Sequence, residues 1–198
     1  DKNDELGNLS DKINALLAYA EANEVHQQEY QRYLTKKTQL DPMTQLFNKN
    51  AVENKIHAMI EQANDTHTRI AVGFLDIDNF RDYNTLYGHQ EGDRFVASIL
   101  KENIDGIVGR NGGDEFLFCL AAVDSKTTIE NEIRTVFEKL QEGLINLETG
   151  ERMSIPCSIG IFAENGSQLH YSYMVQGADA AMYQAKELGK NTYYLNYN

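Results

Sequence analysis

The residues best suited to chemistry lie in a short segment, residues 110–115, with the sequence RNGGDE. Gly112 and Gly113 permit positive φ angles and leave bare backbone, so a bulky ligand can approach the turn closely. Asp114 and Glu115 follow directly, and adjacent carboxylates are costly to hold together unless a cation or a proton is shared between them. The segment has two interpretations: a turn that binds a metal-bound phosphate ester, or an ordinary hairpin tip with solvated acids.

A second pair of carboxylates ends an apolar segment. Residues 69–77 have the pattern of a buried strand, which ends in the sequence Asp76-Ile77-Asp78. Carboxylates at the carboxyl end of a strand point into the crevice where ligands of α/β sheets bind. If this strand lies beside the one that follows the glycines, Asp76 and Asp114 supply separate carboxylates for Mg²⁺. That is the two-metal arrangement for attack of a hydroxyl group on a phosphate.

Around these two segments the chain resembles the GGDEF family of diguanylate cyclases, from about Leu40 to the C-terminus and in the family's order and spacing. The matching residues are Asp41-Pro42-Met43-Thr44, Leu46, Asn48, Asp76-Ile77-Asp78-Asn79-Phe80-Arg81, Asn84, Gly88-His89, Gly92-Asp93, Arg110, Gly112-Gly113-Asp114-Glu115-Phe116, Ser158-Ile159-Gly160-Ile161, Ala178-Asp179, Ala181-Met182-Tyr183, Ala185-Lys186 and Gly189-Lys190-Asn191. An isolated GGDE sequence is a weak signal, whereas this ordered series is specific.

The resemblance implies a mixed α/β (α+β) fold, with a central, mostly antiparallel sheet flanked by helices. This is the GGDEF fold, similar to nucleotidyl cyclases and the polymerase palm, here preceded by a long N-terminal helix. It also implies an enzyme, a diguanylate cyclase that condenses two GTP molecules into cyclic di-GMP and releases two pyrophosphates. Each protomer of an antiparallel homodimer would hold one GTP, and each 3′-hydroxyl would attack the α-phosphate of the other nucleotide.

The resemblance further implies a magnesium site with two ions per GTP, for which Mn²⁺ can substitute. Its ligands would be Asp76, the Ile77 carbonyl, Asp114 and Glu115. The predicted catalytic set consists of Asp114, Glu115 and Arg81. Glu115 is either a metal ligand or the group that favours deprotonation of the 3′-hydroxyl, and the two roles stay open. Solvated surface acids are the alternative interpretation of these carboxylates.

The predicted GTP-binding residues follow from the same resemblance. Asn84 and Asp93 match guanine-reading positions, where a carboxylate accepts from the N1–H and N2–H₂ donors that adenine lacks in that pattern. The remaining predicted GTP contacts are His89, Asn79, Phe80, Arg81, Lys186 and Lys190. The backbone N–H groups of residues 79–81, at the start of a helix, can meet the phosphates. The alternatives are a surface Asn, an ordinary first-turn Asp and solvated lysines.

Several positions depart from the family pattern. Gln45, Phe47 and Lys49 replace the usual Gly, Pro and Arg, which affects the coupling between helix and domain more than the chemistry. Arg81 stands where Lys is usual, and Lys190 where Arg is usual; either cation can meet a phosphate. Asn79 stands where an apolar residue is more usual. Residues 101–106 lack the Arg-x-x-Asp pair of the product-inhibition site that many relatives carry. Arg110 is expected to organise the turn or to reach across the dimer.

Composition limits the partners of the protein. The chain has 198 residues, 41% of them hydrophobic, and a formal net charge of −12. Such an acidic protein has no general affinity for nucleic acid or for an anionic membrane, so attraction to GTP must be local. The two cysteines, Cys119 and Cys157, have no disulfide or metal-ligand spacing and indicate a reducing compartment. No apolar run approaches the roughly 18 residues of a membrane span.

Residues 1–40 form a predicted signalling helix that is separate from the domain at residues 41–198. Apolar residues occupy most a and d positions of a heptad repeat, and Asn23 and Gln27 interrupt the seam, as in a parallel coiled coil with polar register positions. The apolar positions are Leu6, Leu9, Ile13, Leu16, Ala20, Tyr30 and Leu34. Residues 4–9 resemble the second helix of a HAMP domain; an unspecialised amphipathic helix is the alternative. Pro42 disfavours helix in the residue before it and ends the segment.

The rest of the chain alternates as in an α/β domain. Helices are predicted at residues 44–63, 78–87, 90–103, 127–144 and 172–188, and strands at 69–77, 153–162 and 192–197, with two more strands flanking the Gly-Gly turn. Residues 143–150 are predicted to be a surface turn.

The sequence thus predicts a cyclase that works as a dimer of half-sites under an upstream sensor and HAMP module. The resemblance places it in the cytoplasmic part of a bacterial inner-membrane receptor of the kind that controls biofilm formation. A degenerate GGDEF domain that binds GTP or a partner without catalysis is the alternative, and a cyclase for another purine is a third possibility.

Overall fold

The structure, a computed structural model, describes residues 2–79, 91–121, 123–145, 150 and 152–198. The chain divides into two compact units, Asp1–Gln39 and Leu40–Asn198, which are described separately. The first unit is a single helix, α1 (Lys2–Gln39), which ends before Asp41-Pro42 as predicted. Large apolar side chains of α1 are exposed, among them Ile13, Leu16 and Tyr30.

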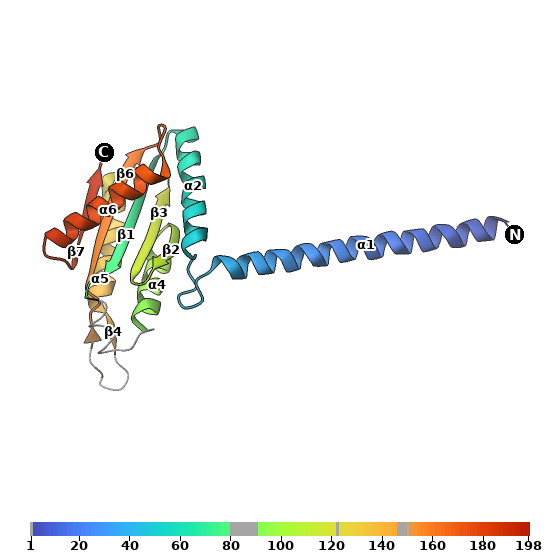
Figure 1. The fold of residues 1–198 in the computed structure, drawn as a ribbon, viewed down its shortest axis with the longest axis horizontal. Helices are drawn as coiled ribbons and strands as arrows, with labels where there is room; N and C mark the ends of the chain where they lie inside the picture. The colour runs from blue at the N-terminus through green and yellow to red at the C-terminus, as the bar shows by residue number, and fades with distance from the viewer. Residues whose placement is uncertain (1, 80–90, 122, 146–149, 151) are drawn as a thin grey trace. The chain divides into compact units, whose positions relative to one another are not determined.

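A five-stranded sheet forms the centre of the second unit (Figure 1). Its strands are β1 (Arg69–Ile77), β2 (Gly106–Gly112), β3 (Glu115–Ala121), β6 (Cys157–Asn165) and β7 (Thr192–Tyr197). They lie in the order β2-β3-β1-β6-β7. All neighbouring pairs are antiparallel except β6 and β7, which are parallel. The predicted class, a mostly antiparallel sheet flanked by helices, is confirmed.

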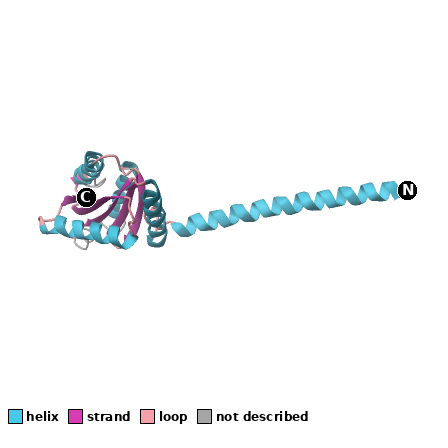
Figure 2. Cartoon of the chain, turned by 90° about the horizontal axis from the view of Figure 1, so that it is seen from above, coloured by secondary structure: helices cyan, strands magenta, loops and turns pink. Residues whose placement is uncertain are grey.

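Helices cover both faces of this sheet, as the view from above shows (Figure 2). α2 (Lys49–Thr66) and α6 (Tyr171–Glu187) pack on one face, and α4 (Glu91–Asn103) and α5 (Lys126–Glu142) pack on the other. The alternation of side chains along β1 explains the two cores, because successive residues of a strand point to opposite faces. Ala71, Leu75 and Ile77 belong to the core under α4 and α5, and Val72 and Phe74 belong to the core under α2 and α6.

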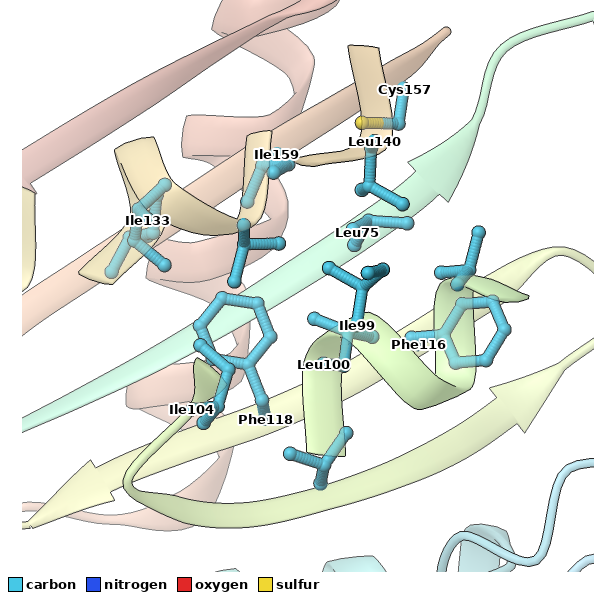
Figure 3. Close-up of a cluster of buried hydrophobic side chains, with 14 of the residues drawn as sticks. Leu75, Ile99, Leu100, Ile104, Phe116, Phe118, Ile133, Leu140, Cys157 and Ile159 are labelled. Atoms are coloured by element: carbon cyan, nitrogen blue, oxygen red, sulfur yellow. The ribbon is translucent and has the colours of Figure 1, made fainter. Parts of the chain in front are cut away.

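The core under α4 and α5 contains the largest buried side chains. Figure 3 shows Leu75 of β1 among Leu100 of α4, Phe118 of β3, Leu140 of α5 and Ile159 of β6. All five side chains are buried. Burial of such apolar side chains fixes β1 in the middle of the sheet, and the end of β1 is where the predicted metal ligands lie.

The start of α2 differs from the prediction. A helix was expected from Thr44, whereas α2 begins at Lys49 with Asn48 as its N-cap, and the Ala51 N–H donates to Asn48 Oδ1 at 3.0 Å. The preceding residues form a turn, because Asp41 Oδ1 accepts from the N–H and the hydroxyl of Thr44 at 2.9 and 2.7 Å. Asp and Thr side chains that bond nearby backbone favour turns over helix.

The predicted strand at residues 153–162 is two strands. β5 (Arg152–Met153) pairs with β4 (Leu144–Ile145) in a small separate sheet, and β6 begins only at Cys157. Pro156 lies between β5 and β6. Proline has no N–H to donate to a neighbouring strand, which explains why the strand is interrupted here. The expected surface turn at residues 143–150 is therefore partly strand. The predicted helix at residues 78–87 falls mostly on residues 80–90, which lie outside the described part of the chain.

Candidate active site

The two acidic segments meet at one end of the sheet. β1 and β3 are antiparallel neighbours in which Asp76 pairs with Glu115, and the Ile77 N–H donates to the Asp114 carbonyl at 3.3 Å. The prediction that the two strands lie side by side is confirmed. Asp76, the backbone of Ile77 and Glu115 thus lie at adjoining positions of two strands, and Asp114, the third predicted acidic ligand, lies in the turn directly before β3.

The pKa of Asp76 is raised in this cluster of acids. Burial raises the pKa of its carboxyl group, and the neighbouring charges of Asp114 and Glu115 raise it further. Lys186 opposes these effects, because its Nζ lies 3.1 Å from Asp76 Oδ1. The ammonium group of Lys186 therefore offsets part of the charge of three carboxylates, which is the situation in which a bound cation stabilises a site.

The Gly-Gly turn leaves open space beside these acids. A Cβ atom added to Gly112 or to Gly113 would meet no heavy atom within 4 Å, and Gly113 has a φ of 48°. Glu115 is oriented from the same hairpin, since Asn111 Nδ2 donates to Glu115 Oε2 at 3.1 Å. Ligand atoms can thus approach the backbone of the turn without meeting a side chain of it.

The donor set suits a hard divalent cation. Within the described residues, no three His, Cys, Asp or Glu side chains close on one point as a complete metal site. Asp76, Asp114, Glu115 and the Ile77 carbonyl offer oxygen donors from two adjoining strands. Mg²⁺ typically takes one or two carboxylates and fills its remaining positions with water and phosphate oxygens. The residues present fit such an ion, with the nucleotide as part of its shell.

Arg110 organises the hairpin, as expected. Its Nε and an Nη donate to the Gly113 carbonyl at 3.0 and 2.7 Å. The same guanidinium forms ion pairs with Asp41, at 3.4 Å, and with Asp93, at 2.5 Å. Burial alone would raise the pKa of Asp41, but hydrogen bonds from Thr44 and the charge of Arg110 lower it on balance. Arg110 therefore joins the turn before α2, the start of α4 and the Gly-Gly hairpin.

The contact of Asp93 with Arg110 was not expected from the sequence. Only 1% of Asp93 is exposed, and its Oδ2 faces Arg110. The structure therefore ties this predicted guanine reader to the hairpin rather than presenting it at an open surface. Its role toward guanine stays a prediction. The other residues predicted in that region, Phe80, Arg81, Asn84 and His89, lie outside the described part of the chain.

The last turn of α6 and the loop after it bring the two predicted phosphate-binding lysines to this end of the sheet. Lys186 lies in its last turn, and Lys190 Nζ reaches Asn79 Oδ1 at 3.4 Å. α6 packs very closely on β6, since a Cβ on Gly160 would lie 1.9 Å from the Met182 backbone nitrogen. The absence of a side chain at Gly160 thus permits the helix to lie close enough for Lys186 to reach Asp76.

Asp78 lies in a different environment from the one predicted for it. Asp78 was expected to point into the ligand crevice, but only 3% of it is exposed, and both of its carboxylate oxygens accept from the Ser158 hydroxyl. β1 ends at Ile77, so Asp78 already lies in the following turn and does not share the direction of Asp76. The isolated Ser158 in an apolar strand was the available signal of a buried polar partner.

Two other sequence expectations concern groups away from the site. Cys119 and Cys157 are buried free thiols in strands, as expected, and burial raises the pKa of both. Among the helices that the structure describes, none has the length and apolar character needed to span a bilayer.

The chain is similar to known proteins in sequence. DosC of Escherichia coli, a diguanylate cyclase, is 29% identical over 157 residues, which are 77% of this chain and 34% of DosC. MucR of Pseudomonas aeruginosa, a bifunctional diguanylate cyclase/cyclic di-GMP phosphodiesterase, is 33% identical over 162 residues, which are 77% of this chain and 23% of MucR. The chain thus spans about a third or less of the length of these relatives.

Solved structures share the fold. The coiled coil and GGDEF domain of DgcB from Caulobacter crescentus, in complex with c-di-GMP, superposes with a TM-score of 0.80 at 24% identity, covering 94% of this chain and 99% of that one. The GGDEF domain of YfiN (TpbB) from Pseudomonas aeruginosa has a TM-score of 0.71 at 27% identity, covering 79% of this chain and 93% of that one. The family described as "Diguanylate cyclase, GGDEF domain" matches residues 38–192. Because that match spans most of the chain, the chain belongs to the GGDEF family of diguanylate cyclase domains.

Proposed function

We propose that this protein is a Mg²⁺-dependent diguanylate cyclase that condenses two GTP molecules into cyclic di-GMP and two pyrophosphates. One observation carries the proposal: Asp76 and Glu115 face each other on two paired strands, and Asp114 lies next to them in the turn that Gly113 leaves open. Lys186, against Asp76, adds a cation at the same place. Such a set serves charge stabilisation and positioning, which phosphoryl-group chemistry requires most.

Each side chain has a role in this proposal. Asp76, Asp114, Glu115 and the Ile77 carbonyl hold the metal ions, which supply neutralisation of phosphate charge and acidification of the 3′-hydroxyl when bound. Lys186 and Lys190, with Arg81 and the backbone of residues 79–81, hold the β- and γ-phosphates. Asn84 and Asp93 read guanine, and His89 lies near the ribose and base. Glu115 additionally favours removal of the proton from the 3′-hydroxyl.

Catalysis requires two copies of the chain in this proposal. Each protomer holds one GTP, so the 3′-hydroxyl of that GTP reaches an α-phosphate only when a second protomer brings another GTP. The heptad positions of α1 support a parallel coiled coil, since Ile13, Leu16 and Tyr30 are exposed within a single chain. A coiled coil raises the effective concentration of one half-site for the other. The catalytic faces then meet in an antiparallel pair.

We further infer that α1 is the continuation of a HAMP-type signalling helix. In that arrangement the parent protein is a bacterial inner-membrane receptor, and the described domain is its cytoplasmic output, which controls processes such as biofilm formation. The exposed apolar positions of α1 and the HAMP-like residues 4–9 support this proposal.

The decisive test measures cyclic di-GMP formed from GTP and Mg²⁺ by the purified protein. Asp114→Ala removes a metal ligand and should lower turnover by about 1,000-fold or more. Asp124→Ala, which changes an exposed aspartate after β3, is the matched control and should keep normal turnover. Normal turnover by Asp114→Ala would overturn the metal assignment. GTP binding without any product in the unaltered protein would favour a degenerate regulatory domain.

The dimer is tested by the dependence of rate on protein concentration. Specific activity should rise with concentration while dimers are scarce and then level off. Removal of residues 1–39, which form a separate unit, should shift this rise to higher concentration and leave the thermal unfolding of the domain unchanged. Specific activity that stays constant over a 1,000-fold dilution range reaching sub-micromolar protein would contradict the half-site mechanism.

A further inference from the structure

The loop between α6 and β7 has a rare backbone conformation. Gly189, Lys190 and Asn191 follow one another with φ angles of 113°, 63° and 46°. The first of these is explained by the end of α6, where the Gly189 N–H donates to the Lys186 carbonyl and the Lys190 N–H donates to the Ala185 carbonyl, as in a Schellman motif. Such a helix end does not require the next two residues to be left-handed, and residues with a Cβ seldom are. Another interaction must hold them.

Asn191 supplies that interaction. Its backbone N–H donates to Asp78 Oδ2 at 2.8 Å. Its side-chain Oδ1 accepts from the Cys157 N–H at 3.3 Å and from Gln141 Nε2 at 2.9 Å, and its Nδ2 donates to Gln141 Oε1 at 3.0 Å. One residue therefore bonds to the turn after β1, to the start of β6 and to α5, three segments that are far apart in the sequence.

Asp78 is the buried anchor of this set. Its carboxylate accepts from the Ser158 hydroxyl at 2.9 and 3.1 Å, and its backbone N–H donates to the Pro156 carbonyl at 2.9 Å. A buried carboxylate is costly unless hydrogen bonds satisfy it, so these donors fix its place. We call the set Asp78, Gln141, Ser158 and Asn191 the asparagine clasp.

The clasp lies between the predicted metal ligand and the predicted phosphate cations. On β1 and its turn, Asp76 and Asn79 lie on either side of the anchor. On the other segment, Lys190 immediately precedes the clasp asparagine, and Lys186 lies five residues before it in the last turn of α6. The two segments also meet directly, through Lys186 Nζ to Asp76 Oδ1 at 3.1 Å and Lys190 Nζ to Asn79 Oδ1 at 3.4 Å. The clasp thus sets the spacing between ligand carboxylate and phosphate cations.

We propose that Asn191 is a positioning residue for GTP, which acts by holding Lys190, and through it the end of α6, in the left-handed loop. This inference rests on the proposed function, because it assumes that Lys186 and Lys190 bind the phosphates. Asn191 contacts no reacting atom in the proposal. Without its side chain, the loop loses the bonds to Gln141 and Cys157, and Lys190 leaves its position beside Asn79. Gln141 contributes indirectly, since it lies on α5 and orients the Asn191 amide.

Three variants separate backbone from side-chain effects. Asn191→Ala removes the amide and retains a Cβ that disfavours the left-handed conformation, whereas Asn191→Gly removes the amide but tolerates that conformation. Gln141→Ala removes the partner on α5. Asn196→Ala changes an exposed asparagine on β7 and is the matched control. The measurements are KM and kcat of the cyclase reaction, the Kd of a non-hydrolysable GTP analogue with Mg²⁺, and Tm.

Asn191→Ala should raise KM for GTP and the Kd of the analogue about five- to tenfold, with kcat within about twofold, as for loss of uniform substrate binding. Asn191→Gly and Gln141→Ala should each raise them about two- to fivefold. Asn196→Ala should change neither constant. Hydrogen exchange gives a readout that needs no nucleotide. The backbone amide proton of Asn191 should exchange slowly in the unaltered protein and faster in Gln141→Ala.

The outcomes are distinguishable. Variants that lower Tm but bind the GTP analogue as tightly as the unaltered protein would overturn the clasp as a positioning device and leave a purely structural role. Equal exchange rates for the Asn191 amide in the unaltered protein and Gln141→Ala would overturn it as well. An unaltered protein that binds no GTP and forms no cyclic di-GMP would overturn the proposed function together with the clasp. If the unaltered protein forms cyclic di-GMP and the variants have the same KM and Kd as the unaltered protein, the clasp proposal alone is overturned.

Discussion

Two left-handed turns border the end of β1, and they are built in opposite ways. The hairpin at Gly112 and Gly113 is bare, and an added Cβ at either position would meet no atom within 4 Å. The loop at Lys190 and Asn191 adopts positive φ with full side chains and is held by hydrogen bonds to the clasp. The first turn leaves space, and the second fixes side chains.

This difference matches the two requirements of a nucleotide site. A phosphate ester must approach backbone and carboxylates closely, which glycine permits. Cations that meet phosphates must already be in place, because ordering a flexible lysine on binding weakens affinity. Arg110 holds the hairpin in place by donating two hydrogen bonds to the Gly113 carbonyl. The turn is therefore open to a ligand and at the same time fixed in its backbone conformation.

Of the variants that compare the two turns, the one that fills the open turn should have the largest effect on activity. Gly113→Ala should lower cyclase activity by about 10- to 100-fold, because the methyl group occupies the approach path of the ligand, while left-handed strain costs about 1–2 kcal/mol of unfolding free energy. Gly150→Ala is a matched control, since Gly150 has a φ of 72° and a Cβ added there would meet no atom of the described residues within 4 Å. It should lose similar stability and no activity. Equal activity losses in both variants would show that the hairpin needs only its backbone shape.

Changes to the asparagine clasp should lower the free energy of unfolding. Asp78→Ala should lower the unfolding free energy by about 2–4 kcal/mol, since it leaves the buried Ser158 hydroxyl and the Asn191 N–H without their acceptor. Chemical denaturation followed by circular dichroism measures this change. A loss below about 0.5 kcal/mol would mean that the clasp adds little to the fold.

Asp76→Asn should have a smaller effect on stability, of opposite sign. The pKa of Asp76 is raised by burial and by its acidic neighbours, so its ionised form is less favourable in the folded protein than in the unfolded chain. Below the unfolded pKa of 3.8 both states are protonated, and this difference vanishes. As pH rises through the raised folded pKa, the unaltered protein loses stability relative to Asp76→Asn.

The metal-free protein and its Asp76→Asn variant are unfolded by denaturant at pH values from 3 to 8. Their free energies of unfolding should differ more as the pH increases. The variant should be the more stable one at neutral pH and should lose cyclase activity. A variant that is less stable at pH 7 would show that the Lys186 ion pair outweighs burial.

The smallest expected effect is the response to product. Residues 101–106 lack the Arg-x-x-Asp pair, and Lys101 and Asp105 are both exposed there. Micromolar cyclic di-GMP should leave the initial rate unchanged, and Asp105→Ala should behave like the unaltered protein. Inhibition that disappears in Asp105→Ala would contradict this prediction and would add a third ligand surface to the comparison.

Local patterns predicted the sheet better than the loops. The strands at residues 69–77 and 192–197 have the predicted bounds, because each is a continuous run bounded by turn residues. The start of α2 was misplaced, because the side chain of Asp41 closes a turn three residues on. The break between β5 and β6 was missed although Pro156, a residue without an N–H, marked it.

The candidate site was also predicted in part. The convergence of Asp76 with the Gly-Gly hairpin was foreseen from strand ends and the family series, and β1 and β3 do pair there. The ion pair of Asp93 with Arg110 was not foreseen, since the two residues are 17 positions apart and no sequence pattern links them. The clasp was not foreseen either.

By itself, the sequence determined the family, the strand-forming segments and the residue types that can hold metal and phosphate, because these depend on composition and on neighbours along the chain. Only the tertiary structure decided which acids lie at the predicted site and which are buried in the fold. Asp76 and Asp78 are two residues apart, yet Asp76 pairs with Lys186, and Asp78 is buried against Ser158 and Asn191. Those partners are 80 and 113 positions away from Asp78, and contacts of that range arise from packing of whole elements rather than from local preference.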